Sequence, residues 1–297
     1  MNPLVSVVIT TKNEEPNIEN CLKSILDQSY QNIEIIVVDN FSTDKTKEIA
    51  LKYTNKFYEK GPERSAQRNY GMIDKSNGEC VMFIDADMIL SFDLVKTCVQ
   101  VISRENFAAL HIPEIVLGRS FFSKCRRFER TFYNGTVIDG ARFFKKDKFV
   151  AVGGFDISMS GPEDWDIDKK IKQIGQIGLI QEKPEVFSQN WELADFIKIR
   201  GVDPSDYRDV IYHNEAEFNL KKYLSKKGYY AQSFTEYINK WGKDDNDIKK
   251  QFGLYYRYFG VFLENGKWKK LLSRLDLTLG MYFLRGMVGV VYLVNKK

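Results

Sequence analysis

The sequence predicts an α/β protein: a mostly parallel sheet with flanking helices, followed by a helical, amphipathic C-terminal appendage. Two observations predict this class. Apolar runs of strand length alternate with segments of helical periodicity in the N-terminal part, and helical periodicity alone continues after residue 219. A chain of 297 residues is long enough for one large domain with such an appendage. We therefore predict domains at 1–215 and 216–297.

Strands and helices alternate in the N-terminal part. Pro16 suits the first turn of one helix, Ser42–Asp44 supply N-cap candidates for a second, and Glu63–Ser76 is expected to form a third. This alternation is typical of right-handed crossovers in a mostly parallel sheet. Four runs are expected to be its strands: Leu4–Thr10, Ile33–Val38, Phe57–Tyr58 and Cys80–Asp85.

Two carboxylates stand at the end of the fourth predicted strand. Asp85 and Asp87 are one residue apart, so in extended backbone they point to the same face. Like charges this close repel each other unless a cation neutralises them. Because ligands bind at the carboxyl ends of strands in open parallel sheets, the pair indicates a divalent metal site for a phosphate-bearing ligand. The alternative is a polar loop that follows a strand.

Polar residues also follow the first two strands. Thr11, Asn13 and Glu14 come after the first strand, and Asp39 comes directly after the second. An acidic residue at that second position is the usual partner of a nucleoside in a doubly wound sheet. These four residues are therefore expected to contact the base or the ribose of a nucleotide.

Arginines are the expected phosphate-binding residues. The sequence contains neither the glycine-rich dinucleotide motif nor a P-loop. The phosphates would then be held by the metal and by Arg64 or Arg68, which lie on the third predicted helix. A solvated helix face is the alternative interpretation of both arginines.

A second acidic pair opens a later helix. Glu163 and Asp164 precede an apolar helical face that includes Trp165 and Ile167. Acidic residues in a first helical turn are favoured by the helix dipole, so simple capping is one interpretation. The other is a general base, because a carboxylate beside a hydroxyl group can take its proton during a transfer reaction.

Five motifs in a fixed order give the chain a family resemblance. It resembles the inverting glycosyltransferases of family 2, which have the GT-A fold. The resemblance covers roughly the first 170 residues and predicts a Rossmann-like catalytic domain. The motifs are Val5–Glu14, Ile36–Asp44, Arg68–Gly71, Phe83–Asp87 and Gly161–Asp164.

The resemblance implies a sugar donor linked to UDP or GDP, Mn²⁺ or Mg²⁺ as cofactor, and inversion at the anomeric carbon. It implies that Asp39 lies near the base, and that Asp85, with Ala86 beside it, lies near the ribose and the metal. Asp87 is the implied direct metal ligand. Asn40–Phe41 departs from the family's usual ending of the second strand, which leaves the identity of the base open.

Three later residues also receive roles from the resemblance. Asp164 is the implied general base, and Glu163 would bind the acceptor or orient its loop. His213 occupies the position from which many enzymes of this fold add a third metal ligand, and imidazole suits Mn²⁺ better than Mg²⁺. A hydrogen bond in the core or to a diphosphate oxygen is the alternative for His213.

The cysteines and the N-terminus predict a cytoplasmic protein. Four cysteines without Cys-x-x-Cys spacing are typical of buried thiols in a reducing compartment. Met1–Pro3 leads into an apolar run that is too short for a signal peptide.

The C-terminal region is basic and rich in aromatic residues. Residues 221–297 contain 16 Lys/Arg and 6 Asp/Glu, so the rest of the chain is net acidic. Asp244–Glu264 is expected to form one helix, and Leu277–Val294 a nearly apolar one interrupted by Arg285. This apolar segment is at the lower length limit for spanning a bilayer, and its arginine opposes insertion. We therefore expect an interfacial region on an anionic membrane, at the cytoplasmic face.

Together these features predict a peripheral membrane enzyme that transfers a hexose-type sugar to a hydroxyl of a glycan or polyprenyl-linked acceptor. A nucleotidyltransferase, which also uses paired aspartates, and a non-catalytic family member acting as a binding subunit are the alternatives. For the C-terminal region, RNA binding and a helical cover or dimer interface are the alternatives. No nucleic acid is among the expected partners.

Overall fold

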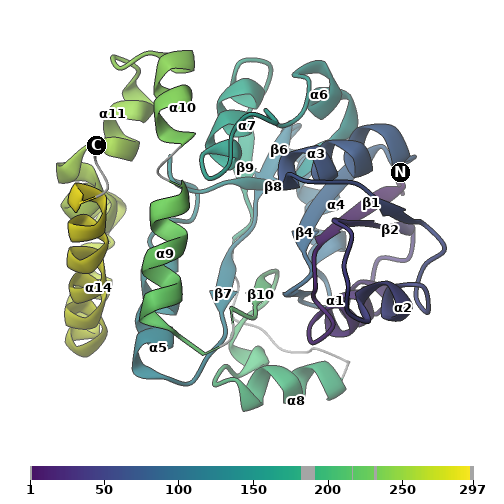
Figure 1. Cartoon of the computed structure of the whole chain (residues 1–297), viewed down its shortest axis with the longest axis horizontal. Helices are drawn as coiled ribbons and strands as arrows, with labels where there is room; N and C mark the ends of the chain where they lie inside the picture. Colours follow the sequence, from purple (N-terminus) through teal and green to yellow (C-terminus); the bar gives the residue numbers. More distant parts are fainter. Residues whose placement is uncertain (1, 182–190, 216, 231–232, 295–297) are drawn as a thin grey trace.

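The computed structural model describes residues 2–181, 191–215, 217–230 and 233–294. Within these ranges a seven-stranded sheet forms the centre of the molecule, in the order β3-β2-β1-β4-β8-β6-β9 (Figure 1). Its strands are β1 (Val5–Thr11), β2 (Ile33–Asp39), β3 (Phe57–Glu59), β4 (Cys80–Asp85), β6 (Ala109–His111), β8 (Ala141–Lys145) and β9 (Ile177–Leu179).

The first four strands of this sheet are parallel, as predicted. β1 pairs with both β2 and β4, and β2 pairs with β3. β8 is antiparallel to β4 and to β6, and β6 is parallel to β9. The register sets Thr11 beside Asp39 and Thr10 beside Asp85. The carboxyl ends of β1, β2 and β4 therefore meet at one edge, and the predicted α/β class is confirmed.

A small second sheet lies next to that edge. Its order is β5-β10-β7, formed by β5 (Met88–Leu90), β7 (Glu114–Val116) and β10 (Ile211–His213). β5 starts directly after Asp87, and antiparallel pairing sets Met88 opposite His213. The small sheet thus brings the end of β10 beside the loop that follows β4, although the two are far apart in the chain.

Helices cover both faces of the large sheet. α1, α2 and α4 bury side chains in the apolar cluster on one face, and η1, α6 and α7 do so on the other. The helices before residue 216 are α1 (Ile18–Leu26), α2 (Thr46–Ala50), α3 (Arg64–Asn69), η1 (Tyr70–Lys75), α4 (Leu94–Arg104), α5 (Phe121–Arg130), α6 (Lys146–Ala151), α7 (Glu163–Lys172), α8 (Trp191–Ile199) and η2 (Pro204–Asp206).

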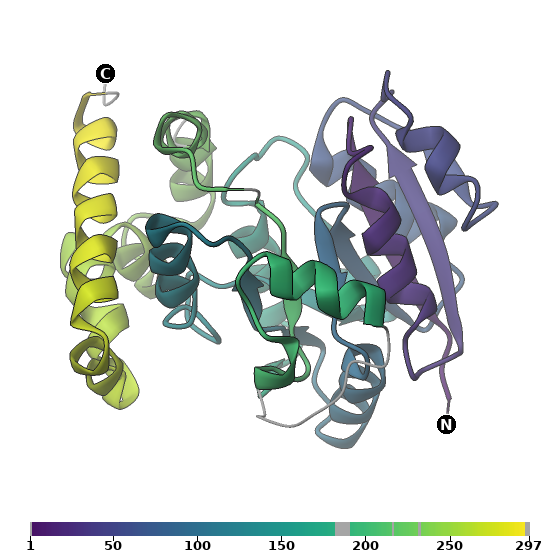
Figure 2. The ribbon, with the colours of Figure 1, turned by 90° about the horizontal axis from the view of Figure 1, so that it is seen from below.

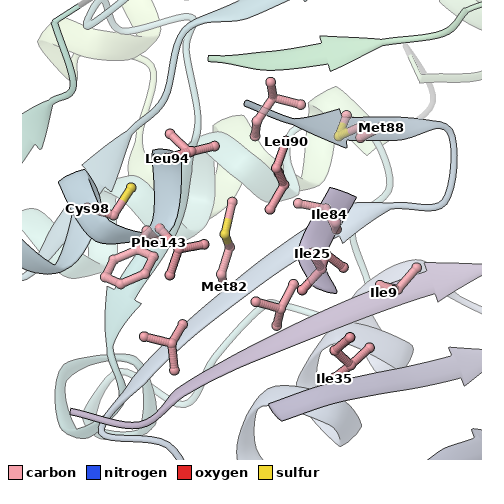
Figure 3. Packing of buried hydrophobic residues seen from close by; sticks show 14 of the residues in the cluster. Ile9, Ile25, Ile35, Met82, Ile84, Met88, Leu90, Leu94, Cys98 and Phe143 are labelled. Carbon is pink, nitrogen blue, oxygen red and sulfur yellow. The ribbon is translucent and has the colours of Figure 1, made fainter. Parts of the chain in front are cut away.

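Strand β4 shows how the core is divided. Met82 and Ile84 pack with Ile25 of α1 in the cluster drawn in Figure 3, whereas Val81 and Phe83 pack in the cluster on the opposite face. Successive side chains of a strand point to opposite faces, so a strand covered on both sides is apolar throughout. This burial fixes β4 in place, and with it the two aspartates at its end.

Helix α2 starts later than the N-cap candidates suggested. Ser42 is bonded to Asp39 instead, and Asp44 accepts hydrogen bonds from the backbone N–H and the hydroxyl of Thr46, the first residue of α2. The segment between β2 and α2 is therefore a loop at the ligand edge, which the sequence pattern could not distinguish from a helix start.

The C-terminal region is helical in its described residues, but one predicted helix is wrong. The single helix expected over Asp244–Glu264 is interrupted at Gly253, where a Cβ would lie 2.3 Å from the carbonyl oxygen of Lys249. The elements are α9 (Leu220–Tyr230), α10 (Phe234–Trp241), α11 (Asn246–Phe252), η4 (Tyr256–Gly260), α12 (Val261–Leu263), η5 (Glu264–Gly266), α13 (Trp268–Ser273) and α14 (Leu275–Val294).

These C-terminal helices pack onto the rest of the molecule through apolar contacts. Phe132 and Tyr133, just after α5, share a buried cluster with Val261, Phe262 and Met281. Figure 2 shows α14 along one edge of the molecule, beyond α5. None of the helices within the described ranges combines the length and the apolar character that a bilayer crossing requires. The division into domains at residues 215 and 216 stays a prediction.

Candidate active site

The carboxyl edge of the sheet gathers the polar residues that follow β1, β2 and β4. The hydroxyl of Thr10 donates a hydrogen bond to Asp85 Oδ1 at 3.2 Å, across the β1–β4 pair. Asp39 and Ala86 are buried at the same edge, and the Thr11 hydroxyl is buried without a hydrogen-bond partner. Four of the predicted nucleotide-contacting residues therefore lie at the ends of three neighbouring strands.

The loops after β1 and β2 are bonded to each other. Asp39 accepts hydrogen bonds from the backbone N–H of Ser42 at 2.7 Å and from its hydroxyl at 2.5 Å. The backbone N–H of Asn13 donates to the Ser42 hydroxyl at 2.7 Å, and Asn13 Oδ1 accepts from the N–H of Thr43 at 2.8 Å. Asn13 and Phe41 both have a φ of 53°. This left-handed backbone, rare for residues other than glycine, shows that the two loops are held in a defined shape.

Glu14 joins the same edge from the start of the helical connection. Its carboxylate accepts a hydrogen bond from Asn17 at 2.7 Å, and its backbone N–H donates to the Thr46 hydroxyl at 2.8 Å. Burial raises the pKa of Glu14, and the negative charges of Asp87 and Asp85 raise it further. Glu14 therefore lies close enough to these two aspartates to experience their charge.

Arg68 connects the acidic pair that follows β4 with the acidic pair that opens α7. Its guanidinium donates to Asp164 at 3.1 Å and to Asp85 at 3.3 Å, and it lies 3.7 Å from Glu163. The side chain is buried and its guanidinium carbon is 4.0 Å from the centre of the Phe83 ring. One side chain therefore bridges the ends of β4 and α7.

The charges in this network keep Asp85 ionised. Burial alone would raise the pKa of Asp85, but the positive charges of Arg68, Arg64 and Arg142 outweigh it and hold the pKa well below its usual range. Asp85 is thus a carboxylate, and it faces Arg68 in this structure.

Glu163 and Asp164 differ in exposure. The Asp164 side chain is 33% exposed, whereas that of Glu163 is 3% exposed and paired with Arg64 at 3.1 Å. Burial raises the pKa of Glu163, as does the charge of Asp164, and its carboxylate also accepts a hydrogen bond from the backbone N–H of Gly161. Gly140 lies against Asp164, where a Cβ would come within 2.8 Å of the Asp164 Cβ. Asp164 is therefore the member of the pair that a substrate can reach.

Asp87 and His213, two of the residues expected to bind a metal, lie together at the junction of the two sheets. His213 Nε2 lies 3.2 Å from Asp87 Oδ2, and Asp87 Oδ1 is buried without a hydrogen-bond partner. The other ring nitrogen of His213 contacts Glu114, which pairs with Arg130 at 2.9 Å and Arg142 at 3.2 Å. Burial lowers the pKa of His213, but the charges of Asp87 and Glu114 outweigh it and raise the pKa well above its usual value.

The donor atoms of this junction fit a hard divalent ion, with two protein ligands. No group of three or more His, Cys, Asp or Glu side chains in the described part of the chain is arranged to hold a metal. Asp87 offers the unpartnered oxygen, and Asp85 is turned towards Arg68. His213 would offer Nε2 after a bound cation displaces the proton that Asp87 attracts there. Carboxylate and imidazole suit Mn²⁺, and Mg²⁺ is usually bound by few carboxylates together with substrate phosphates.

Further residues hold the catalytic candidates in place, and the sequence pattern alone does not reveal them. Glu114 is one, and its signal was an acidic residue inside an apolar strand. Trp241 and Lys240 of α10 are others: they donate to the fully buried Asp166 at 2.8 and 3.0 Å, two residues after Asp164. The neighbouring Trp165 stacks on Phe234 at 6.1 Å. The C-terminal helices thus contact the first turn of α7.

Residues 6–159 match the sequence model of the family described as Glycosyl transferase family 2. The chain belongs to this family. It is 30% identical over 159 residues to a GalNAc(5)-diNAcBac-PP-undecaprenol beta-1,3-glucosyltransferase of Campylobacter jejuni, an alignment that covers 50% of this chain and 48% of that protein. It is 31% identical over 150 residues to the glycosyltransferase GlyG of Streptococcus pneumoniae, with coverage of 48% and 44%. The chain spans about half the length of these curated relatives.

Solved structures of glycosyltransferases confirm the GT-A-like fold. The mannosyltransferase PcManGT from Pyrobaculum calidifontis, in complex with GDP-Man and Mn²⁺, has a TM-score of 0.62 at 19% identity, over 99% of this chain and 85% of that chain. TarS 1–349 from S. aureus in complex with UDP has a TM-score of 0.51 at 17% identity, with coverage of 99% and 90%. At these identities the likeness concerns the fold alone. The predicted family and fold are thus confirmed.

Proposed function

We propose that this protein is a metal-dependent inverting glycosyltransferase, which moves a sugar from a UDP- or GDP-linked donor to an acceptor hydroxyl. The observation that carries the proposal is the bridge made by Arg68. Its guanidinium contacts Asp85 on the donor edge and Asp164 on α7 at the same time. The group that would bind the donor and the group that would activate the acceptor are therefore within one side chain of each other, as a direct transfer requires.

The donor nucleoside would bind along the ends of β1 and β2. Asp39 would accept a hydrogen bond from the base, and the loop that Asn13 and Ser42 hold in place would form the wall beside it. Phe41 is exposed on this loop, and its ring is free to lie against a planar base. Thr11, with its unpartnered hydroxyl, would contact the ribose.

Asp87 and His213 would hold Mn²⁺ or Mg²⁺, and oxygens of the donor diphosphate would complete its coordination. Glu114 contacts the second nitrogen of His213 and so fixes the orientation of the ring. When bound, the metal would act as a Lewis acid that stabilises the charge of the departing nucleoside diphosphate. Arg64, which is less buried than Arg68, would add positive charge on the phosphate side.

Asp164 would act as the general base. As the bond between the anomeric carbon and the diphosphate oxygen breaks, the acceptor oxygen forms the new bond from the opposite face, and its proton passes to Asp164. Arg68 would orient Asp164 rather than bind phosphate, because its guanidinium is buried among carboxylates. Glu163 would hold the turn before α7 through Gly161 and Arg64.

The acceptor would be a hydroxyl of a glycan or a polyprenyl-linked sugar, and the protein would act at the cytoplasmic face of a membrane. Support comes from the Campylobacter relative, whose name specifies an undecaprenol-linked substrate, and from the basic, aromatic C-terminal region of this chain. The alignment covers about half of this chain and half of the relative, so we propose only the chemical class of the acceptor.

Product analysis tests the proposal. The protein is first screened by thermal shift with UDP, GDP, dTDP and CDP in the presence of Mn²⁺, and sugar donors of the stabilising nucleotide are then incubated with it. We expect release of a nucleoside diphosphate, stimulated by the metal. Release of pyrophosphate would instead identify a nucleotidyltransferase, and absence of any metal-stimulated turnover would indicate a binding subunit.

A further inference from the structure

The helix α14 carries an exposed charge in its first turn, where Asp276 pairs with Arg274, and a single charge that points inward in the rest of its length. Arg285 is the only charged residue from Leu277 to Val294. Its side chain is buried and donates to Glu129 at 2.6 Å and to the hydroxyl of Tyr133 at 2.7 Å, both on the α5 side. Surface helices of soluble proteins usually show the reverse arrangement, with apolar residues inside and charges outside.

The opposite side of α14 is apolar and exposed. Leu275, Leu279, Phe283 and Val290 are exposed by 61%, 73%, 53% and 56%. Their spacing of four, four and seven residues puts them on one stripe of a helix. We call these four residues the α14 outer face. Both Figure 1 and Figure 2 show α14 at the edge of the molecule. The ring of Phe283 also stacks on Phe122 of α5, with 5.8 Å between the ring centres, so only part of this side chain is exposed.

Basic and aromatic residues stand at the N-terminal end of this face. α13 exposes Trp268 and Leu272 together with Lys269 and Lys270. Neither lysine forms an ion pair within the described part of the chain. An apolar stripe flanked by tryptophan and lysine is the composition of helices that lie in the interface of an anionic membrane.

A second copy of the chain is the other occupant that an apolar stripe could accept. A symmetric dimer through this face would bring two identical basic patches towards each other, because a two-fold interface joins a surface to itself. An anionic lipid surface instead attracts the same lysines. Charge complementarity therefore favours lipid.

We propose that the α14 outer face, together with Trp268, Lys269 and Lys270, binds the interfacial region of an anionic membrane with α14 parallel to the membrane plane. This inference rests on the proposed membrane location and deepens it by naming the surface. The buried ion pair between Arg285 and Glu129 would then keep α14 attached to the protein while the α14 outer face enters the headgroup region.

Vesicle flotation of the full chain tests the inference. We compare vesicles of phosphatidylcholine alone with vesicles that also contain phosphatidylglycerol. The wild type is expected to float with the anionic vesicles, and the double variant Leu275→Gln/Leu279→Gln to lose binding by about tenfold or more. Leu51→Gln/Ile199→Gln is the matched control, because these residues are similarly exposed elsewhere and should float like wild type. Circular dichroism checks that all variants are folded.

A charge-reversal variant measures the electrostatic contribution to vesicle binding. Lys269→Glu/Lys270→Glu should reduce binding to anionic vesicles and show a weaker dependence on salt than wild type. Wild-type flotation by the outer-face double variant would overturn the inference. So would a wild type that does not float but forms a dimer that the double variant abolishes. Nucleotide binding without vesicles reports on the active site separately, so failure of the proposed transferase function would be seen there and not in flotation.

Discussion

Arg68 and Arg285 are both buried arginines that contact carboxylates, yet they lie in regions with different tasks. Arg68 joins carboxylates at the ends of β4 and α7, both of which are partly open to solvent. Arg285 joins α14 to α5 through Glu129, which is fully enclosed. The first network arranges groups that a substrate would meet, and the second removes a charge from the surface of an apolar helix. Burial of an arginine therefore does not by itself identify a functional site.

The largest expected effect is on the carboxylate that Arg68 orients. Asp164→Asn should lower the rate of sugar transfer by about 10²–10⁴-fold, because the amide cannot take the acceptor proton. Metal-dependent nucleotide affinity, measured by calorimetry, should stay at the wild-type value. Asp168→Asn is an unsuitable control, since it pairs with His111, so the exposed Asp147→Asn serves instead and should retain activity. A variant at Asp164 that keeps full activity would remove the base assignment.

Matched substitutions of the two arginines sharpen the comparison. Arg68→Met and Arg285→Met should each lower the free energy of unfolding by about 1.5–3 kcal/mol, because each removes charge-assisted hydrogen bonds to carboxylates. Glu129 keeps its contact with Arg126, and Glu163 keeps its contact with Arg64. Urea unfolding measures this loss. Only Arg68→Met should also abolish transfer under conditions where the protein is folded. Equal activity loss in both variants would mean that the networks are not functionally distinct.

Acid should weaken the Arg285 network. Burial would raise the pKa of Glu129, but Arg126 and Arg285 outweigh it and lower the pKa from 4.5 to about 2. Because the folded-state pKa is lowered, the network stabilises the fold above pH 4.5, and this contribution of about 2–3 kcal/mol is lost as the pH falls towards 2. Between pH 6 and pH 3, the free energy of unfolding should fall less for Glu129→Gln than for wild type. An equal fall in both proteins would contradict the assignment of this acid sensitivity to Glu129.

The smallest expected effect concerns the link between the two regions. Trp241→Phe removes the hydrogen bond to Asp166 and keeps most of the ring, while Lys240 and Lys170 still contact that carboxylate. We expect a loss of about 1 kcal/mol in unfolding free energy and a several-fold fall in kcat, with nucleotide affinity unchanged. Tyr255→Phe, at an exposed position of the C-terminal region, should change neither quantity. A fall in nucleotide affinity would show that α10 acts on the donor side instead.

Much of the donor edge was predictable because it follows from strand topology. Parallel strands place their carboxyl ends at one edge, so Asp39 and Asp85 could be brought together before any coordinates were known. Local patterns also marked the pair Asp85–Asp87 and the pair Glu163–Asp164, and the resemblance to family 2 assigned their individual roles and added His213.

The remaining contacts depend on tertiary packing. Glu114 meets His213 because two short strands pair across nearly 100 residues, and Arg285 meets Glu129 because α14 docks on α5. The arginine in the apolar segment was interpreted as an obstacle to membrane insertion. Its inward orientation could not be derived from a helical pattern that is apolar on every side.

The central claim, a metal-assisted nucleotide-sugar site at the end of β4, is tested most directly by titrating Asp87→Ala with UDP and GDP in the presence and absence of Mn²⁺. The wild type should bind its nucleotide more tightly when Mn²⁺ is present. Asp87→Ala should lose that metal-dependent gain, lowering affinity by more than about tenfold, while remaining folded. Equal nucleotide affinity of wild type and Asp87→Ala in Mn²⁺ would contradict the account.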